Sequence, residues 1–301
     1  MKQYQIISDG SCDLPEELVE ETGIDVIPFY VSFDDKTYQK EIQEIGIRDF
    51  YQKMVDFPGV YPKSSMPSVT DFMDAFVKYA KENVPVICIC ITTKFSGSMQ
   101  SAVNARDMTL EKYPRAQITV INSTINTVLQ GLYVLEAVKM QAAGVSYEKT
   151  IERLEAIKST GRIFFTVGNM EYLKHGGRIG QLTALAGSVL GIRPIITLKE
   201  GEIFSSGISR SRKKSMQKSL DLLLDYIKAS KEPVDHFSIT IGFGYDYEEA
   251  LGFRELAVEQ LKKLDDTFTE EKLPIRQIGA TISVHTGPYP IGFAIVKKWD
   301  M

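Results

Sequence analysis

The sequence predicts an α/β protein made of two domains. Short β-branched runs alternate with helical patterns in the first half of the chain, which favours a parallel sheet covered by helices. The pattern of predicted strands and helices changes after Gly161. The chain has 301 residues, about twice the length of a common domain of roughly 150 residues. We therefore expect an N-terminal domain over residues 1–160, with a mostly parallel sheet flanked by helices, and a C-terminal α+β sandwich over residues 161–301.

Four short apolar runs in the first half are expected to be buried strands. They are rich in β-branched residues and are followed by Ser, Asp, Asn or Gly, which end strands. The four runs cover residues 5–8, 26–31, 86–91 and 118–121.

Helix-start signals lie between these runs. Asp13 offers an acidic N-cap, followed by an early proline and by Glu16 three residues on. Ser68 can cap a second helix, whose apolar positions keep a period near 3.6. Further helical patterns cover residues 104–112 and 128–143.

The second half mixes a hairpin with strand–helix–strand patterns, which is typical of an α+β domain. Strands are expected at 162–167, 193–198, 202–206, 237–242, 277–283 and 291–297. Helices are expected at 170–174, 215–228 and 247–264.

The composition excludes several classes of protein. A formal net charge of -4 argues against a broad nucleic-acid-binding surface. The longest apolar stretch, residues 84–91, is far shorter than the roughly 20 residues that span a bilayer, and the N-terminus reaches Asp9 too soon for a signal peptide. Cys88 and Cys90 lie within an apolar run, so we expect buried small hydrophobes rather than a disulfide framework. A cytoplasmic location follows from these expectations.

Common catalytic motifs are missing from the sequence. It has no Gly-x-Ser-x-Gly elbow, no His-Glu-x-x-His, no Walker phosphate loop and no Gly-x-Gly-x-x-Gly. The three histidines are far apart along the chain, so a metal centre has little local support. We therefore expect a binding protein without a cofactor and without catalytic machinery of its own.

A hydroxyl- and glycine-rich turn at residues 92–98 is the best candidate site. It joins the most apolar predicted strand to a helix, and ligands of open α/β sheets bind beyond the carboxyl ends of strands. A helix N-terminus presents free N–H groups to an anion, and Gly97 lets a ligand oxygen approach the backbone. Ser96, and Ser64 from an earlier turn, can add hydroxyl donors. These features predict a site for a carboxylate or a phosphate.

Three further clusters have both functional and structural interpretations. Arg178 follows two glycines and can face a phosphate, or it can be a solvated arginine after a helix cap. His285 follows an apolar alternation, where a hydrogen-bonded structural imidazole is also common. The basic run 210–214 opens a helix, and such a run is most often a solvated face.

Taken together and in this order, the clusters resemble the DegV family of bacterial lipid-binding proteins, which includes the fatty-acid-binding subunits of the bacterial fatty acid kinase. The resemblance covers essentially the whole chain. Its motifs are Ser-Asp-Gly-Ser-Cys-Asp-Leu at 8–14, Lys-Ser-Ser-Met-Pro-Ser at 63–68, Phe-Ser-Gly-Ser-Met-Gln-Ser-Ala at 95–102, Leu-Lys-His-Gly-Gly-Arg-Ile at 173–179, Arg-Pro-Ile at 193–195, Arg-Ser-Arg-Lys-Lys at 210–214 and His-Thr-Gly-Pro at 285–288.

The resemblance implies a long-chain fatty acid held between the two domains, with its carboxylate bound by hydroxyl groups. Matched motif to motif, Ser96 and Ser64 would bind the carboxylate. The backbone of Gly97 and the helix from Ser98 would complete an anion nest, and His285 would close over the same head group. The walls of the acyl site could come from the helix at 128–143 and from residues 184–190, both of which could also be ordinary core.

The resemblance also implies a partner, a fatty acid kinase catalytic subunit that uses ATP. Arg178, Arg210 and Arg212 would contact this kinase, and the product would be an acyl phosphate. No nucleic-acid partner is expected, and peripheral membrane contact would allow lipid exchange.

Two alternatives stay open beside this carrier hypothesis. One is an enzyme: a serine acyl hydrolase with Ser96 as nucleophile and His285 as base, or a phosphotransferase acting on a small anionic ligand. The other is a lipid sensor that serves no kinase. Sequence does not reveal the distance between Ser96 and His285, on which the hydrolase depends.

Overall fold

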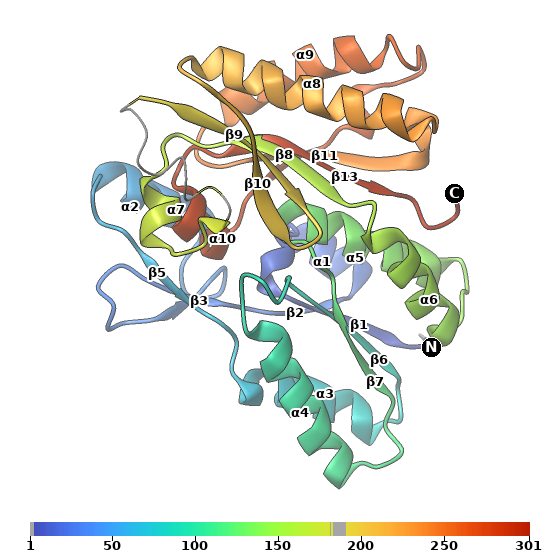
Figure 1. Cartoon of the computed structure of the whole chain (residues 1–301). Helices are drawn as coiled ribbons and strands as arrows, with labels where there is room; N and C mark the ends of the chain where they lie inside the picture. The colour runs from blue at the N-terminus through green and yellow to red at the C-terminus, as the bar shows by residue number, and fades with distance from the viewer. Residues whose placement is uncertain (1–2, 181, 183–190) are drawn as a thin grey trace.

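The computed structural model describes residues 3–180, 182 and 191–301, and it is built around two sheets (Figure 1). The first is a parallel sheet with the strand order β2-β1-β6-β7. Its strands are β1 (Gln5–Asp9), β2 (Asp25–Ile27), β6 (Val86–Cys90) and β7 (Ile118–Asn122). The expected parallel sheet of the first half is thus confirmed.

Helices cover both faces of this sheet because its strands are apolar on both faces. Alternate residues of β6 show this, since Ile87 and Ile89 pack toward α5 whereas Cys88 and Cys90 pack toward α3 and α4. Both cysteines are fully buried and free, as expected. The helices are α1 (Glu16–Thr22), α3 (Val69–Lys81), α4 (Ser98–Lys112), α5 (Thr127–Ala142) and α6 (Tyr147–Lys158).

The second sheet has six strands in the order β10-β9-β8-β13-β11-β12. All neighbouring pairs are antiparallel except β11 and β12. The strands are β8 (Arg162–Thr166), β9 (Arg193–Lys199), β10 (Glu202–Ser209), β11 (Phe237–Phe243), β12 (Ile275–Gln277) and β13 (Ile291–Lys297). Helices α8 (Arg212–Ser230) and α9 (Tyr247–Leu261) cover one face, and α5 packs on the other face. The expected C-terminal α+β layer is confirmed.

A third, small sheet lies beside the other two, in the order β4-β3-β5. Helices from both halves of the chain meet around it, because Tyr51, Tyr172 and Val284 share one apolar cluster with Val31. The elements concerned are β3 (Tyr30–Ser32), β4 (Gln39–Lys40), β5 (Lys63–Ser65), α2 (Ile47–Asp56), α7 (Glu171–His175) and α10 (Ala280–Thr286).

Two expected strands differ from the structure. The run 26–31 is divided at Pro28, which lacks an N–H group, so β2 and β3 belong to different sheets. The second expected strand, 277–283, is not a strand. Its first residue is the last of β12, and residues from Ala280 on belong to α10, so His285 lies on a helix. Nearly every residue of α10 is buried, and its apolar residues Ala280, Ile282 and Val284 alternate with polar ones, a pattern that is typical of a strand.

One of the two expected helix caps is wrong. Ser68 caps α3 in a capping box with Asp71, as expected. The first helix, by contrast, begins at Glu16 after Pro15. Asp13 has a left-handed backbone and accepts a hydrogen bond from the hydroxyl of Thr127 at 2.5 Å. Its carboxyl group therefore joins α5 instead of capping α1.

Within residues 3–180, 182 and 191–301, no helix combines the length and the apolar composition needed to cross a membrane.

Candidate functional site

A cavity of about 270 Å³ lies between the carboxyl ends of the parallel strands and the six-stranded sheet. Its volume is slightly below the range of small-molecule sites, which is roughly 300 to 1,000 Å³. The interior is apolar and buried, with side chains drawn from both halves of the chain. These apolar residues are Phe29, Ile91, Val128, Ile163, Phe165, Leu173, Leu198, Ile203, Ile278, Ile282 and Phe293.

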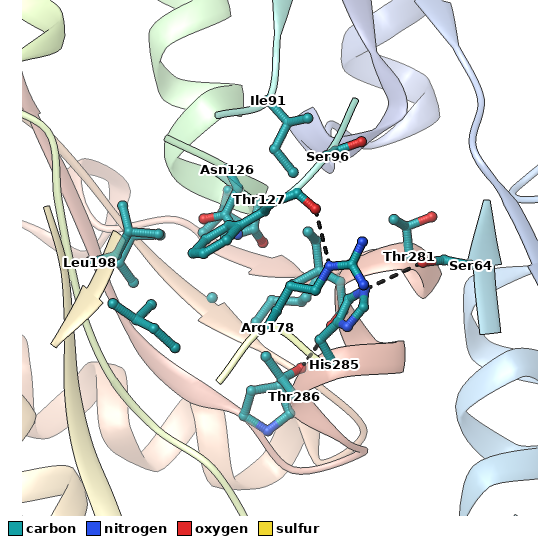
Figure 2. A pocket seen from close by; sticks show the side chains of 18 of the residues that line it. Ser64, Ile91, Ser96, Asn126, Thr127, Arg178, Leu198, Thr281, His285 and Thr286 are labelled. Atoms are coloured by element: carbon teal, nitrogen blue, oxygen red, sulfur yellow. Dashed lines mark hydrogen bonds between the residues drawn. The ribbon is translucent and has the colours of Figure 1, made fainter. Parts of the chain in front are cut away.

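Polar side chains gather at one end of the cavity (Figure 2). Ser64 comes from β5, Ser96 from the turn before α4, and His285 from α10. The Ser64 hydroxyl lies 3.3 Å from Nε2 of His285. Gly97 and Met66 also line this end, and both are exposed to solvent, so the polar end is the mouth of the cavity.

The turn at 92–97 holds Ser96 in a defined position. The N–H groups of Phe95 and Ser96 donate to the carbonyl oxygen of Thr92 at 3.1 and 3.3 Å. The backbone N–H of Ser98 donates to Oγ of Ser96 at 3.1 Å. Because this bond occupies an acceptor position of Ser96, its own O–H remains able to donate to a ligand anion.

Gly97 lies against the exposed side chain of Met66, just after β5. A Cβ atom at position 97 would lie 2.8 Å from Sδ of Met66, so the flexible methionine side chain would have to shift. Gly97 also directly precedes α4, a helix of 15 residues whose first N–H groups favour negative charge nearby. The turn lies directly before a helix as expected, and its binding of an anion stays a prediction.

His285 is neutral at physiological pH. Desolvation by the surrounding protein lowers the pKa of its imidazole to about 4, and the positive charge of Arg178 acts in the same direction. Its Nδ1 atom has no hydrogen-bond partner among the described residues. A neutral imidazole carries one donor and one acceptor, so His285 can donate to a ligand oxygen without adding charge.

Arg178 lies at the mouth of the cavity. Its Nε donates to the carbonyl oxygen of Phe95 at 3.1 Å, and a terminal nitrogen donates to that of Gly176 at 2.9 Å. It is exposed, and it is the only formally charged residue that the described part of the chain contributes to the wall. The two carbonyl bonds hold the guanidinium at the mouth, and the expected contact of Arg178 with a kinase stays a prediction.

Two more expected site residues have structural roles. Ser98 is outside the wall, because its buried hydroxyl donates to Asp9 at 2.7 Å and its N–H to Ser96. Arg212 forms a bidentate ion pair with Glu249, at 2.8 and 2.5 Å, and is only partly exposed. Its guanidinium is thus already engaged within the protein. The hydroxyl and the N–H of Ser98 are thus engaged within the protein, and the expected kinase contact of Arg212 stays a prediction.

Three further expectations concern Arg210 and the two segments that were expected to form the walls of the acyl site. Arg210 is exposed and has neither a hydrogen bond nor an ion pair with residues 3–180, 182 or 191–301. Of the expected helix at 128–143, only Val128 lines the cavity. Most of its other apolar residues are buried in the core, and its last residues, Ala142 and Ala143, are exposed. The other expected wall segment, residues 184–190, lies outside the described residues.

Sequence analysis missed three carboxyl groups buried behind the site. Glu41, which is 2% exposed, accepts the N–H groups of Phe29 and Thr281 at 3.3 and 3.0 Å, and both of these residues line the cavity. Burial raises the pKa of Glu41 to about 7. Burial also raises the pKa values of Asp9 and Asp13. Glu41 follows a charged stretch of sequence, so no local pattern indicated that it is buried.

The described residues hold no group of three or more His, Cys, Asp or Glu side chains that could bind a metal ion. The described residues also do not bring His285 into contact with Ser96, the expected nucleophile. The imidazole lies against Ser64 and not Ser96, and no carboxylate orients its Nδ1 atom. A Ser–His–acid arrangement around Ser96 is therefore not assembled in the described part of the chain.

Comparison with known proteins relates the chain to one family and to solved structures of similar fold. A family model described as "Uncharacterised protein, DegV family" matches residues 3–298. A DegV domain-containing protein of Caldanaerobacter subterraneus is 30% identical over 99% of this chain and 100% of its own length. A fatty acid (stearic acid)-binding protein of Eubacterium ventriosum is 40% identical, with a TM-score of 0.91 over 99% of both chains. A DegV family protein of Thermus thermophilus, described by its fatty acid binding, is 27% identical with a TM-score of 0.82 over 98% and 99%.

Glu41 and His285 are expected to affect the free energy of unfolding in opposite ways as the pH changes. The raised pKa of Glu41 means that stability is lost as the pH rises from about 4.5 to about 7. The lowered pKa of His285 means that stability is lost as the pH falls from about 6.5 to about 4. Relative to wild type, Glu41→Gln should therefore gain about 3 kcal/mol across the first range, and His285→Gln about 3 kcal/mol across the second.

Urea denaturation at a series of pH values measures both effects. The exposed Glu17→Gln variant is the control and should follow the wild-type profile. Variant curves parallel to the wild-type curve would contradict the shifted pKa values of Glu41 and His285.

Proposed function

Because this chain belongs to the DegV family, we propose that it binds a long-chain fatty acid between two domains, residues 1–160 and 161–301. One observation carries the proposal: a single cavity combines a buried apolar interior with a mouth of hydroxyl, imidazole and guanidinium groups. The stearic acid-binding relative, at 40% identity over nearly the whole of both chains, supports the same ligand class.

The apolar interior supplies the affinity for the acyl chain. Burial of each methylene contributes about 0.8 kcal/mol, so a chain of about sixteen carbons contributes roughly 10 kcal/mol before ordering costs. Ile91 and Leu198 are 3% and 1% exposed, which keeps water from this part of the wall. The interior therefore suits an alkyl chain better than a phosphorylated small molecule.

The mouth supplies the donors for the carboxylate. A carboxylate that leaves water needs several hydrogen bonds to offset its desolvation. The O–H groups of Ser64 and Ser96 and the neutral imidazole of His285 provide them, and Arg178 adds a positive charge at the solvent side. We assign the carboxylate to this group of four side chains, with the backbone of Gly97 beside them.

We further propose that the protein presents this carboxylate to a partner fatty acid kinase. The kinase would transfer the γ-phosphoryl group of ATP to a carboxylate oxygen, which forms an acyl phosphate and releases ADP. The position of Arg178 at the exposed mouth supports access by a second protein. So does the exposed Arg210, which has no partner among the described residues. A partner that uses ATP places this function in the cytoplasm, and the exposed Met66 at the mouth supports peripheral membrane contact during lipid exchange.

The first test is mass spectrometry of an organic extract, where we expect one fatty acid per chain. Stearic acid affinity should then fall about 10- to 100-fold in Ser96→Ala, because a hydrogen bond to a charged group contributes roughly 1.5–3 kcal/mol. Ser205→Ala, at an exposed position on β10, is the matched control. An empty extract with no uptake of added stearic acid would contradict the proposed ligand.

The kinase role predicts a separation of two effects. Arg210→Ala should keep the wild-type affinity for stearic acid and lose most acyl phosphate formation with ATP and the kinase of the same organism. Arg178→Ala should lose both, because Arg178 lines the mouth. Arg115→Ala, an exposed arginine after α4, should change neither property. Unchanged acyl phosphate formation in Arg210→Ala would remove this residue from the kinase contact.

The acyl hydrolase is the competing function, and the hydrogen bond between Ser64 and His285 is the observation in its favour. We expect no stoichiometric labelling by a fluorophosphonate probe, since His285 lacks an orienting carboxylate. Intact-protein mass spectrometry measures the labelling, with Ser64→Ala and Ser96→Ala as site controls. One probe per chain, lost in either variant, would replace the carrier with an enzyme.

A further inference from the structure

Helix α5 begins inside the wall of the cavity, with Asn126, Thr127 and Val128 as consecutive lining residues (Figure 2). Asn126 is 8% exposed. Its side-chain Oδ1 accepts no hydrogen bond from the described residues. A buried amide oxygen without a partner is uncommon and costly, so its surroundings need an explanation.

Capping of the helix does not provide that explanation. An asparagine at the N-cap ordinarily accepts the N–H of the second or third helical residue. Asn126 occupies the N-cap of α5, yet its side chain makes no capping bond. The first turn of α5 therefore keeps N–H donors without a side-chain acceptor, at the same place where Oδ1 of Asn126 lacks a donor.

The backbone at this point is strained. Thr127 has a φ of 50°, a left-handed value that a β-branched residue rarely adopts. The bond between its hydroxyl and the carboxyl group of Asp13 holds it there. Such strain persists where the surrounding structure imposes it, and it is concentrated at ligand sites.

The chemistry of these atoms selects among ligand groups. A methylene against Oδ1 of Asn126 would leave the oxygen buried and unpaired. A second carboxylate would suit the N–H groups of α5 but would face the amide oxygen of Asn126 with like partial charge. A hydroxyl group satisfies both sides, since it donates to Oδ1 and accepts from an N–H group.

We propose that the start of α5 forms a polar subsite for a hydroxyl group on the acyl chain, so that the protein selects hydroxy fatty acids. This inference rests on the proposed function. The carboxylate lies with Ser64 and Ser96 at the mouth, and the hydroxyl group lies against Asn126 farther along the wall. A site built to bond a hydroxyl group discriminates against the ligand that lacks it.

Competitive displacement tests the subsite, with stearic acid and a set of monohydroxystearic acids that carry the hydroxyl at successive carbons. We expect wild type to bind one isomer about tenfold more tightly than stearic acid. Asn126→Leu, which replaces the amide by an apolar group of similar volume, should reverse this preference. Asn104→Leu, on the exposed face of α4, is the matched control and should keep it.

A crystal structure with the preferred isomer is the second measurement, and it does not depend on the folding of any variant. A hydrogen bond between the ligand hydroxyl and Asn126 would support the subsite. Wild type that binds every hydroxy isomer more weakly than stearic acid, or a water on Asn126 beside the ligand, would overturn it and leave the proposed function intact. Binding of neither stearic acid nor any isomer would instead refute the proposed function itself.

Discussion

The buried carboxyl group of Asp9 holds the candidate site together. One of its oxygens accepts the N–H of Ile91 at 2.9 Å and the hydroxyl of Ser98 at 2.7 Å, and the other accepts the side-chain amide of Gln130 at 2.8 Å. Burial raises the pKa of Asp9, and these donors partly offset that effect. Through them a single side chain links the end of β6, the start of α4 and the first turn of α5. The bonds to Ile91 and Ser98 flank the turn at 92–97, so the geometry of this turn depends on Asp9.

Local signals were sufficient to predict the parallel sheet and the position of the turn at 92–97 beyond the end of a strand. The carboxyl ends of parallel strands meet at one edge, so Ser96 and Gly97 could be placed from the position of their turn after a strand. The family resemblance added the head-group role of His285, which the structure brings to within 3.3 Å of Ser64 across 221 residues of sequence. No periodicity in the sequence indicates such a contact, because it depends on the packing of α10 against β3 and α2.

The remaining residues could not be predicted because their partners are distant in the sequence. Arg212 belongs to a basic run, but Glu249 on another helix engages its guanidinium. Glu41 follows charged neighbours in the sequence, yet its side chain is buried and accepts a hydrogen bond from the N–H of Thr281, which lies 240 residues later. Asn126 reads as a helix cap, and only the tertiary structure shows that its side chain makes no capping bond. In each case burial, and hence chemical role, is set by long-range packing.

Helix α5 packs between the two sheets, and one apolar core joins Ile89 of the first sheet, Leu129 of the helix and Ile196 of the second sheet. This arrangement has a consequence for the way the protein can evolve. Recombination that exchanged one half of the chain between relatives would leave α5 against a foreign partner and would disturb both sides of the core at once. Changes of ligand preference are therefore more accessible through single substitutions in the wall than through the shuffling of domains.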